Sequence, residues 1–349
     1  MLAVAAQSAY PSSVASRRVR LDNHAARLRT LGVRLDLDSP LDESGYAPLA
    51  RRRDLVSKAR VGISTARGLA RMHAASRDAS LLMVHRLRSL VPVPGVDPPR
   101  RVDVYDFDDA LFAAPRRRLH DRLKREPERF DVYLGSARLV IAGNEYLADR
   151  ACKIAAKVEV IPSCIEVLAE TPPPARLEAQ TLGWIGSPTT TPYVEALIPK
   201  LAPLRSRFPE LRLILVGAQP QRKLPDWVDV RTWSPASEAT ALAEMDVGLM
   251  PLPDDPWSRG KCGYKLLQYA AAGVPSVGDP VGVNRRILDG IGGVAPLKAR
   301  TWPSEISELL LDRQARDEIA TRGHKFVDRE FSYRRWTPEL ATLLRDLAG

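Results

Sequence analysis

Short apolar runs alternate along this chain with longer stretches of helical pattern. Alternation of this kind is typical of parallel sheets whose faces are covered by helices. In the first half, the stretches 17–31, 51–77 and 116–136 are predicted to be helices. The predicted strands of this half are LAVAAQ (2–7), VRLDL (33–37), SLLMVHR (80–86), VDVYDF (102–107), LVIAG (139–143) and VEVIP (158–162).

The alternation stops at ETPPPARLEA (170–179) and then begins again. Three consecutive prolines cannot continue a strand or a helix and favour an extended spacer. We therefore predict a linker at 169–179 between domains at 1–168 and 180–330, and a C-terminal helix at 331–349 that packs back toward the first domain. Two open α/β units of this kind leave a cleft at the carboxyl ends of their strands, where ligands bind.

The second half repeats the same pattern of elements. Helices are predicted at 192–207, 238–244 and 264–272, with two more before Gly349. The predicted strands are TLGWIGS (181–187), LRLILVGA (211–218), VDVRTW (228–233), VGLMPL (247–252) and PSVGD (275–279).

The net charge of +10 comes entirely from residues 1–165 and is concentrated in RRRDLVSKAR (51–60) and RRRLHDRLKR (116–125). These runs are read either as solvated helix faces or as a surface for an anionic acceptor or lipid. No aromatic residues interleave them to stack on bases, so no nucleic-acid partner is expected.

The three cysteines, Cys152, Cys164 and Cys262, form no CxxC pair and predict reduced thiols without a zinc site. The N-terminal MLAVAAQSAYP lacks the basic and apolar regions of a signal peptide. We expect a cytoplasmic protein, either free or held at the inner membrane face by its basic half. The sequence leaves its oligomeric state open.

The segment PLPDDPWSRGKCGYKLLQYAAAGVPSVGDPVG (251–282) carries the densest set of candidate residues. Gly260 and Gly263 bracket Lys261 just before a predicted helix, and Gly273 is predicted to end that helix in the left-handed conformation. Amides at a helix start next to Arg259 and Lys261 are suited to binding a diphosphate.

Lys261, Lys265 and Gln268 are spaced to share one helical face. A lysine near the phosphates and an amide one turn deeper, near the ribose, would bind a nucleotide together. The alternative is that Lys265 and Gln268 merely cap a surface helix. Tyr264 and Trp233 are added as nucleotide-binding candidates.

A second anion site is predicted in GWIGSPTTTP (183–192). Gly186 allows close approach of the backbone to a phosphate, and Ser187, Thr189 and Thr190 offer hydroxyls. Thr191 is predicted to be the N-cap of the following helix, with Pro192 in its first turn.

These segments resemble the donor domain of GT-B glycosyltransferases, and most of all the retaining glycosyltransferase family 4. The resemblance implies two Rossmann-like domains, with a nucleotide-diphosphate sugar bound by the second half and the acceptor bound by the first. The acceptor would be a small natural product or an envelope glycan or lipid. The matching stretches are TLGWIGSPTTTPYVEAL, LRLILVGA, MDVGLMPLPDDPWSRGKCGYKLLQYAAAGVPSVGDPVG and HKFVDREFSYRRWTPELATLLRDL, and, more loosely, SRRVRLDNHAARLRTLGV, VDVYDFDDALF and VIAGNEYLADRACK.

Two positions depart from the family pattern. The family's Glu-x7-Glu signature falls on Gly260 and Gln268, so the carboxylate near the donor sugar is missing and an amide stands where the second contacts the ribose. The family's Arg and Lys after the first glycine of the donor domain are replaced by Ser187 and the threonines. Arg259 and Lys261 are the candidates for the lost positive charge.

The run VYDFDDALF (104–112) places Asp106, Asp108 and Asp109 at the end of a predicted strand. Two alternatives are the metal-binding DxD of GT-A enzymes and a phosphotransfer DxDxT motif, in which Ala110 stands where Thr or Val belongs. In a GT-B chain these aspartates would bind the acceptor, with Asp108 as the candidate for catalysis. His85 is a second catalytic candidate at the end of its strand, where it is otherwise structural.

Ser16 and Arg18, in the loop after the first strand, are further acceptor-site candidates. In the expected reaction the anomeric C–O bond breaks and negative charge grows on the departing diphosphate. Arg259, Lys261 and helix N-termini would stabilise that charge without a metal or other cofactor. The rival functions are a non-hydrolysing nucleotide-sugar epimerase and an inactive nucleotide-binding subunit.

Overall fold

The computed structural model describes residues 1–43, 55–90, 93, 96–97, 99, 101–114, 125–168, 172–296 and 301–349, and of 55–61 the backbone alone. The described residues form two compact units. Unit 1 comprises Met1–Cys164, Gly260–Cys262 and Tyr333–Gly349, and unit 2 comprises Ile165–Arg259 and Gly263–Ser332. The division at Cys164 lies a few residues before the predicted linker 169–179, of which 169–171 fall outside the described residues.

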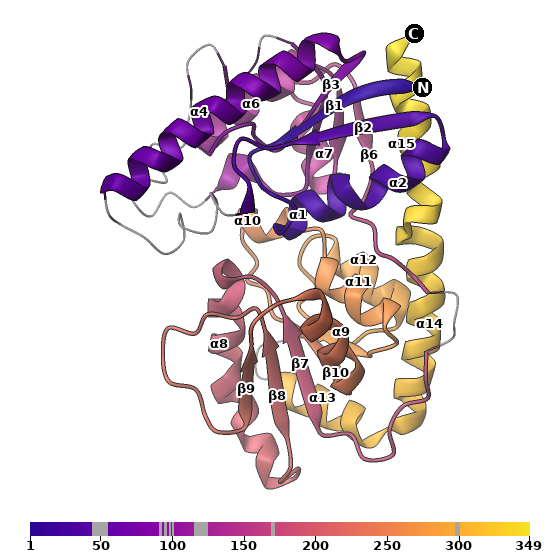
Figure 1. The fold of residues 1–349 in the computed structure, drawn as a ribbon. Helices are drawn as coiled ribbons and strands as arrows, with labels where there is room; N and C mark the ends of the chain where they lie inside the picture. The colour runs from indigo at the N-terminus through magenta and orange to yellow at the C-terminus, as the bar shows by residue number, and fades with distance from the viewer. Residues whose placement is uncertain are drawn as a thin grey trace. The chain divides into compact units, whose positions relative to one another are not determined.

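Unit 1 is built on a six-stranded parallel sheet with the order β2-β1-β3-β4-β5-β6 (Figure 1). Its central strands are almost wholly buried, as expected for strands covered by helices on both sides. All six strands predicted from the first half are confirmed. Their bounds are Leu2–Ser8 (β1), Val33–Asp38 (β2), Leu81–His85 (β3), Val102–Phe107 (β4), Ala137–Ala142 (β5) and Val158–Val160 (β6).

The helices of unit 1 depart from the predictions in two places. The predicted helix 17–31 is present as a continuous helical stretch over 15–30 that contains a π-helical segment, Arg18–Asp22, and the seven-residue helix α7 was not predicted. In the predicted helix 116–136 the described helix begins at Glu126, and 116–124 lie outside the described residues. The helices are α1 (Ala15–Arg17), η1 (Arg18–Asp22), α2 (Asn23–Thr30), α4 (Leu55–Asp78), η2 (Leu111–Ala113), α6 (Glu126–Ser136), α7 (Glu145–Ala151) and α15 (Tyr333–Ala348).

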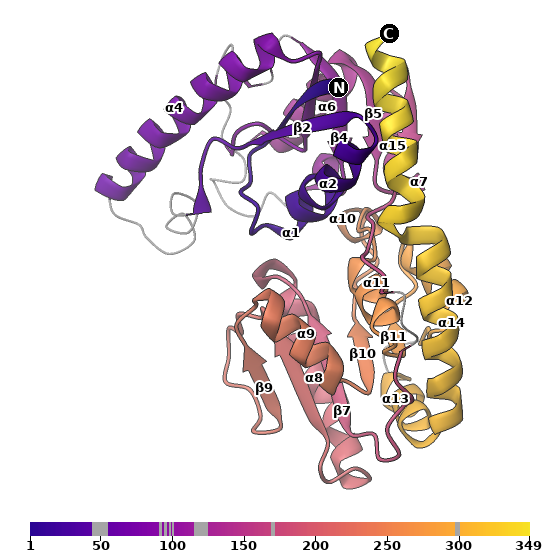
Figure 2. The same ribbon diagram turned by 45° about the vertical axis from the view of Figure 1, so that its right-hand side comes forward.

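The C-terminal helix α15 packs on α2 within unit 1 (Figure 2). Asn23 donates its side-chain amide to the Tyr333 hydroxyl at 3.0 Å, and His24 Nδ1 lies 2.8 Å from Thr337 Oγ1. Leu340 of α15 is buried in the same apolar core as Val4 of β1. The end of the chain is therefore part of the first unit's core.

Unit 2 is built on a five-stranded parallel sheet with the order β11-β10-β7-β8-β9. The chain moves from β7 outward to β8 and β9 and then crosses to the other side of β7 for β10. The strand order thus reverses between β7 and β10, and ligands of open α/β sheets bind beyond the carboxyl ends of strands at such a point. All five predicted strands are confirmed: Thr181–Ile185 (β7), Arg212–Val216 (β8), Val228–Arg231 (β9), Val247–Met250 (β10) and Ser276–Gly278 (β11).

The helices of unit 2 correct three predictions. Helix 192–207 is an α-helix followed by a 3-10 turn, and the helix at 238–244 starts earlier at a capping box on Ser234. Four described helices, not two, follow β11, three of them in this unit and α15 in unit 1. The helices of this unit are η3 (Pro188–Thr190), α8 (Thr191–Leu201), η4 (Ala202–Ser206), α9 (Pro235–Glu244), α10 (Pro256–Arg259), α11 (Tyr264–Ala271), α12 (Asn284–Ile291), α13 (Trp302–Leu311) and α14 (Arg313–Phe331).

Apolar residues fill two cores in unit 2. Trp184 and Leu215 belong to one, and Leu266 and Ile287 to the other. Gly273 has φ +72°, which confirms its predicted left-handed conformation after α11. None of the helices in the described part of the chain is long and apolar enough to cross a membrane.

Candidate active site

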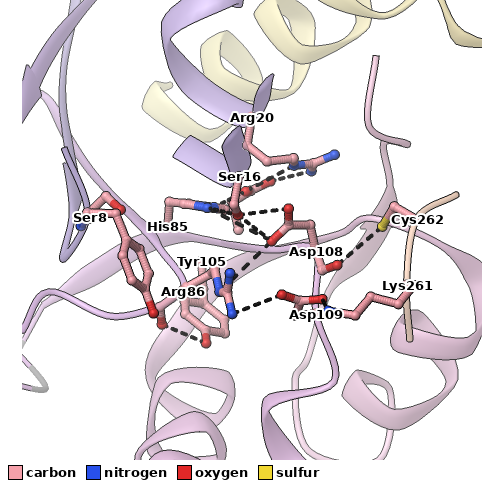
Figure 3. Close-up of polar contacts among 12 residues, drawn as sticks. Ser8, Ser16, Arg20, His85, Arg86, Tyr105, Asp108, Asp109, Lys261 and Cys262 are labelled. Atoms are coloured by element: carbon pink, nitrogen blue, oxygen red, sulfur yellow. Dashed lines mark hydrogen bonds and ion pairs between the residues drawn. The ribbon is translucent and has the colours of Figure 1, made fainter. Parts of the chain in front are cut away.

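Charged side chains gather in unit 1 where β3 and β4 end (Figure 3). His85 is the last residue of β3 and pairs in register with Asp106 of β4. Asp108 and Asp109 follow β4, and Ser16 approaches from α1. Because carboxyl ends of neighbouring parallel strands share one edge of a sheet, these predicted acceptor-side residues come together.

A chain of hydrogen bonds joins four of these side chains. The buried Arg20 guanidinium donates to both oxygens of Asp106, and His85 Nδ1 lies 2.7 Å from Asp106 Oδ2. His85 Nε2 lies 2.8 Å from the Ser16 hydroxyl, which also donates to Asp108 at 2.7 Å. The pattern fixes the ring of His85 between Asp106 and Ser16.

Asp106 stays ionised in this buried setting. Burial alone would raise the pKa of its carboxyl, but the Arg20 guanidinium and the His85 ring outweigh it and hold the pKa at about 2. An ionised carboxylate accepts hydrogen bonds only, so the Nδ1 of His85 carries a proton and donates it to Asp106.

Asp109 is clamped between two cations. Arg86 Nη2 lies 2.9 Å from Asp109 Oδ2, and Lys261 Nζ lies 2.6 Å from Asp109 Oδ1. Burial would raise the pKa of the Asp109 carboxyl, but Lys261 and Arg86 outweigh it and bring the pKa below its ordinary value. Arg86 has a left-handed backbone, with φ 59°, and its guanidinium lies 5.2 Å from the Tyr10 ring centroid. Strained backbone of this kind is concentrated at functional sites.

Lys261 reaches Asp109 because the segment Gly260–Cys262 belongs to unit 1. The Asn144 side-chain amide donates to the carbonyls of Gly260 and Lys261 at 3.2 and 3.3 Å, and Cys262 Sγ lies 3.3 Å from the Asp108 carbonyl. A Cβ on Gly260 would lie 2.5 Å from the Ala110 Cβ. The glycine is thus required by close packing.

The environment of Cys262 is determined by the same contacts. Burial raises the pKa of the Cys262 thiol to about 12, so it is a neutral thiol at physiological pH. A Cβ on Gly143 would lie 2.6 Å from Cys262 Sγ, which leaves no room for a side chain there.

The predicted shared helical face of Lys261, Lys265 and Gln268 is wrong. Helix α11 begins at Tyr264, and Gly263 before it has φ 65°, so Lys261 lies outside the helix. Arg259 does not join Lys261 either, because its guanidinium pairs with the exposed Asp254 at 2.6 Å. Two cations that are separated by one residue in the sequence therefore have different carboxylate partners.

Other predicted residues have mixed outcomes. Arg18 donates to the Ser13 carbonyl at 3.3 Å, in the loop before α1. Tyr264 packs against an apolar core of unit 2, and a Cβ on Gly263 would lie 2.5 Å from Ile287 Cδ1. These contacts show that Gly263, which precedes α11, and Tyr264, its first residue, have packing roles.

In unit 2, the turn after β7 brings Gly186 and Lys265 together. A Cβ on Gly186 would clash with the Trp184 ring and lie 3.0 Å from Lys265 Cε. Lys265 Nζ lies 5.3 Å from the centroid of the Trp184 ring. A bare backbone and a lysine at the carboxyl end of β7, where strand order reverses, suit a phosphate group.

The hydroxyls after Gly186 form hydrogen bonds within their own turn, to each other or to the Ser187 carbonyl. Ser187 Oγ lies 2.9 Å from Thr189 Oγ1, and Thr190 Oγ1 donates to the Ser187 carbonyl at 3.1 Å. The predicted N-cap role of Thr191 is wrong, because it is the first helical residue and Thr190 precedes it as N-cap. Thr191 instead accepts a hydrogen bond from the Gln219 amide at 3.0 Å.

Gln268 and Trp233 are joined by a carboxylate that was not predicted. Gln268 Nε2 donates to Glu238 Oε1 at 2.7 Å, and Trp233 Nε1 donates to Glu238 Oε2 at 2.5 Å. In the sequence Glu238 is an acidic residue in a first helical turn, which the helix dipole alone explains. Asn144, Arg20 and Arg86 were also missed, since only the tertiary structure brings them to the site.

Among the described residues, no group of three or more His, Cys, Asp or Glu is arranged to hold a metal ion. The aspartates after β4 that could have formed one have other partners. Asp106 is bound by Arg20, and Asp109 is bound by Arg86 and Lys261.

Comparisons with known proteins concern both the sequence and the fold. Residues 179–312 match the family model described as "Glycosyl transferases group 1". No curated protein matches the chain by sequence.

Solved structures of similar fold include sucrose-phosphate synthase from Thermosynechococcus elongatus, with 14% identity, TM-score 0.71 and 99% of each chain covered. WaaG, a glycosyltransferase involved in lipopolysaccharide biosynthesis, has 14% identity, TM-score 0.69 and 99% of each chain covered. Anabaena Alr3699/HepE in complex with UDP and glucose has 15% identity and TM-score 0.71, with 99% of this chain and 100% of that chain covered. At this identity the likeness is one of fold.

Proposed function

We propose that this chain, whose residues 179–312 match the model of group 1 glycosyltransferases and whose fold is GT-B, is a glycosyltransferase that transfers a sugar from a nucleoside-diphosphate donor to a hydroxyl-bearing acceptor. Unit 2 holds the donor and unit 1 the acceptor. The observation that carries the proposal is the meeting of Gly186 and Lys265 at the carboxyl end of β7, inside the segment that matches the family. Retention at the anomeric carbon is the expectation that comes with the family resemblance.

The donor diphosphate is proposed to lie over the Gly186 turn. Gly186 packs under the Trp184 ring and beside the Lys265 side chain, so Lys265 supplies a positive charge at the same turn. When the anomeric bond breaks, negative charge grows on the leaving diphosphate, and a fixed cation stabilises this charge more than that of the bound donor. Lys265 therefore takes the role that the sequence assigned to Arg259 and Lys261.

The acceptor hydroxyl is proposed to bind at Asp108. In the structure the Ser16 hydroxyl occupies a position between Asp108 and His85 Nε2, at 2.7 and 2.8 Å. A hydroxyl has one proton, so it donates to only one of these partners at a time. An acceptor hydroxyl at this place would be oriented by the same two groups, with Asp106 and Arg20 fixing the ring of His85.

Catalysis is proposed to need no metal ion, because Lys265 supplies positive charge at the leaving diphosphate. Turnover is expected to persist in EDTA, and its loss with recovery on adding Mg²⁺ would contradict this part of the proposal.

A screen of UDP-, GDP-, ADP- and dTDP-sugars by thermal shift, followed by product analysis with candidate acceptors, tests the function. Lys265→Ala should lower turnover about 100-fold or more, because it removes a charge that acts on the transition state. Lys200→Ala, an exposed lysine at the far end of α8, is the matched control and should turn over as wild type does.

The rival functions give different results in the same screen. Consumption of donor without any acceptor and with an epimerised product would indicate an isomerase. Nucleotide binding without turnover of any donor would indicate an inactive subunit. Wild-type turnover in Lys265→Ala would refute the proposed donor site.

A further inference from the structure

Glu238 is a carboxylate held in place by two neutral donors. It lies in the first turn of α9, and its oxygens accept hydrogen bonds from Trp233 Nε1 at 2.5 Å and Gln268 Nε2 at 2.7 Å. Gln268 is only 6% exposed, so its amide is fixed among buried neighbours. A carboxylate has about four lone-pair sites, and two of them are used here. Within the described part of the chain these are its two side-chain donors, so the half-buried carboxylate keeps lone pairs for further donors.

The carboxylate lies one helical turn from the proposed phosphate site. Gln268 follows Lys265 by three residues on α11, which places the two on one face and about 4.5 Å apart along the axis. Lys265 meets the Gly186 turn, and Glu238 meets Gln268. Lys265 and the Gln268 amide that binds Glu238 thus follow each other along α11, in the order of the diphosphate and ribose of a nucleotide.

A ribose offers two neighbouring hydroxyl donors, and acidic side chains bind such hydroxyls in nucleotide sites of α/β folds. An amide alone is a weaker acceptor, and Gln268 already donates its NH2 group to Glu238. We propose that Glu238, positioned by Trp233 and Gln268, binds the ribose hydroxyls of the donor and selects ribonucleotide sugars over 2′-deoxyribonucleotide sugars. This inference rests on the proposed function and names its substrate class.

Calorimetry with nucleoside diphosphates tests the selection without knowledge of the sugar or acceptor. UDP, GDP and ADP are each compared with their 2′-deoxy forms, and the tightest ribonucleotide is used thereafter. A hydrogen bond to a charged group corresponds to about 10- to 100-fold in affinity. Wild type should therefore bind the ribonucleotide at least about tenfold more tightly than its 2′-deoxy form.

Glu238→Gln should remove this preference. It keeps the shape of the side chain and loses the charge, so the ribonucleotide should lose at least about tenfold in affinity. The 2′-deoxy form, which offers only its 3′ hydroxyl, should lose less, and the two affinities should become similar. Glu244→Gln is the matched control in the same helix, where Glu244 pairs with Arg231 at 2.8 Å. That variant should keep the wild-type ratio of affinities.

A charge exchange separates recognition from folding. Gln268→Glu alone places two carboxylates in contact and should weaken ribonucleotide binding. The double variant Glu238→Gln with Gln268→Glu restores one carboxylate and one amide, and it should regain preference for the ribonucleotide. Thermal unfolding of each variant identifies any that fails to fold.

Two negative results have different meanings. If Glu238→Gln weakens both forms of the nucleotide equally, or neither, the assignment of Glu238 is wrong while the proposed function stands. If wild type binds none of the nucleoside diphosphates, the proposed function and this inference are both overturned.

Discussion

At the scale of single residues, the partner of a charged group determines what it can do. Lys261 was expected to act on a diphosphate, but its charge is matched by Asp109, which Arg86 also holds. Lys265 has a similar sequence setting yet lies at a glycine turn. The two lysines differ in their neighbours and not in their chemistry, and the neighbours come from distant parts of the chain.

Asp109→Asn should destabilise the protein markedly. It removes the negative charge between the largely buried Arg86 and Lys261 and weakens the compensation of both cations, because Asp108 lies farther from Arg86, at 4.0 Å. The cost should be on the order of 3 kcal/mol. Denaturant unfolding measures this loss. Asp254→Asn, which breaks the exposed pair with Arg259, is the control and should unfold as wild type does. Equal behaviour of the two variants would show that the Asp109 cluster adds nothing to stability.

At the scale of elements, strands were easier to predict than the segments that connect them. Every predicted strand is present, because a short apolar run bounded by turn residues favours a strand, whether it is buried throughout, as in β3, or alternates with exposed residues, as in β2. Helix α7 has only seven residues, and its start depends on a cap, since the Asn144 side chain accepts from the Leu147 amide at 3.0 Å. The same side chain also holds the segment Gly260–Cys262.

Asn144→Ala removes both the cap of α7 and the hydrogen bonds to the segment Gly260–Cys262. The free energy of unfolding should fall by about 2 kcal/mol. Asn144→Asp keeps an oxygen for the cap but places it against the Gly260 and Lys261 carbonyls, so it tests the second contact alone. Ser234→Ala removes the cap of α9 and is the reference for a cap without a second role, at about 1 kcal/mol. If Asn144→Ala costs no more than Ser234→Ala, the segment is not held by Asn144.

At the scale of the whole chain, distant segments complete unit 1. Helix α15 returns to α2, where His24 is 2% exposed and meets Thr337 and the edge of the Tyr333 ring. Burial lowers the pKa of His24 to about 3, with a further contribution from the charge of Arg20. Folding therefore requires the neutral imidazole.

Lowering the pH should destabilise the folded protein because His24 is buried as a neutral imidazole. His24 binds a proton near pH 6.5 in the unfolded chain and only near pH 3 in the folded chain. The contribution of His24 to the free energy of unfolding is therefore fully present above pH 6.5 and is lost as the pH falls toward 3. At pH 4 the loss from this group is about 3 kcal/mol. Unfolding measured from pH 7 to 4 should show a shallower decline for His24→Gln than for wild type. His73→Gln, an exposed histidine of α4, should follow the wild-type curve, and a wild-type slope in His24→Gln would contradict the assignment.

The sequence by itself determined the two parallel sheets, the order of their strands along the chain, and the glycines and polar residues at their carboxyl ends. These follow from local patterns, because burial on both faces and left-handed turns each demand particular residue types at fixed spacing. Only the tertiary structure decided that Lys261 pairs with Asp109, that Glu238 joins Gln268, and that α15 closes unit 1. Such pairings depend on the path of the chain between distant segments, and no local pattern encodes that path.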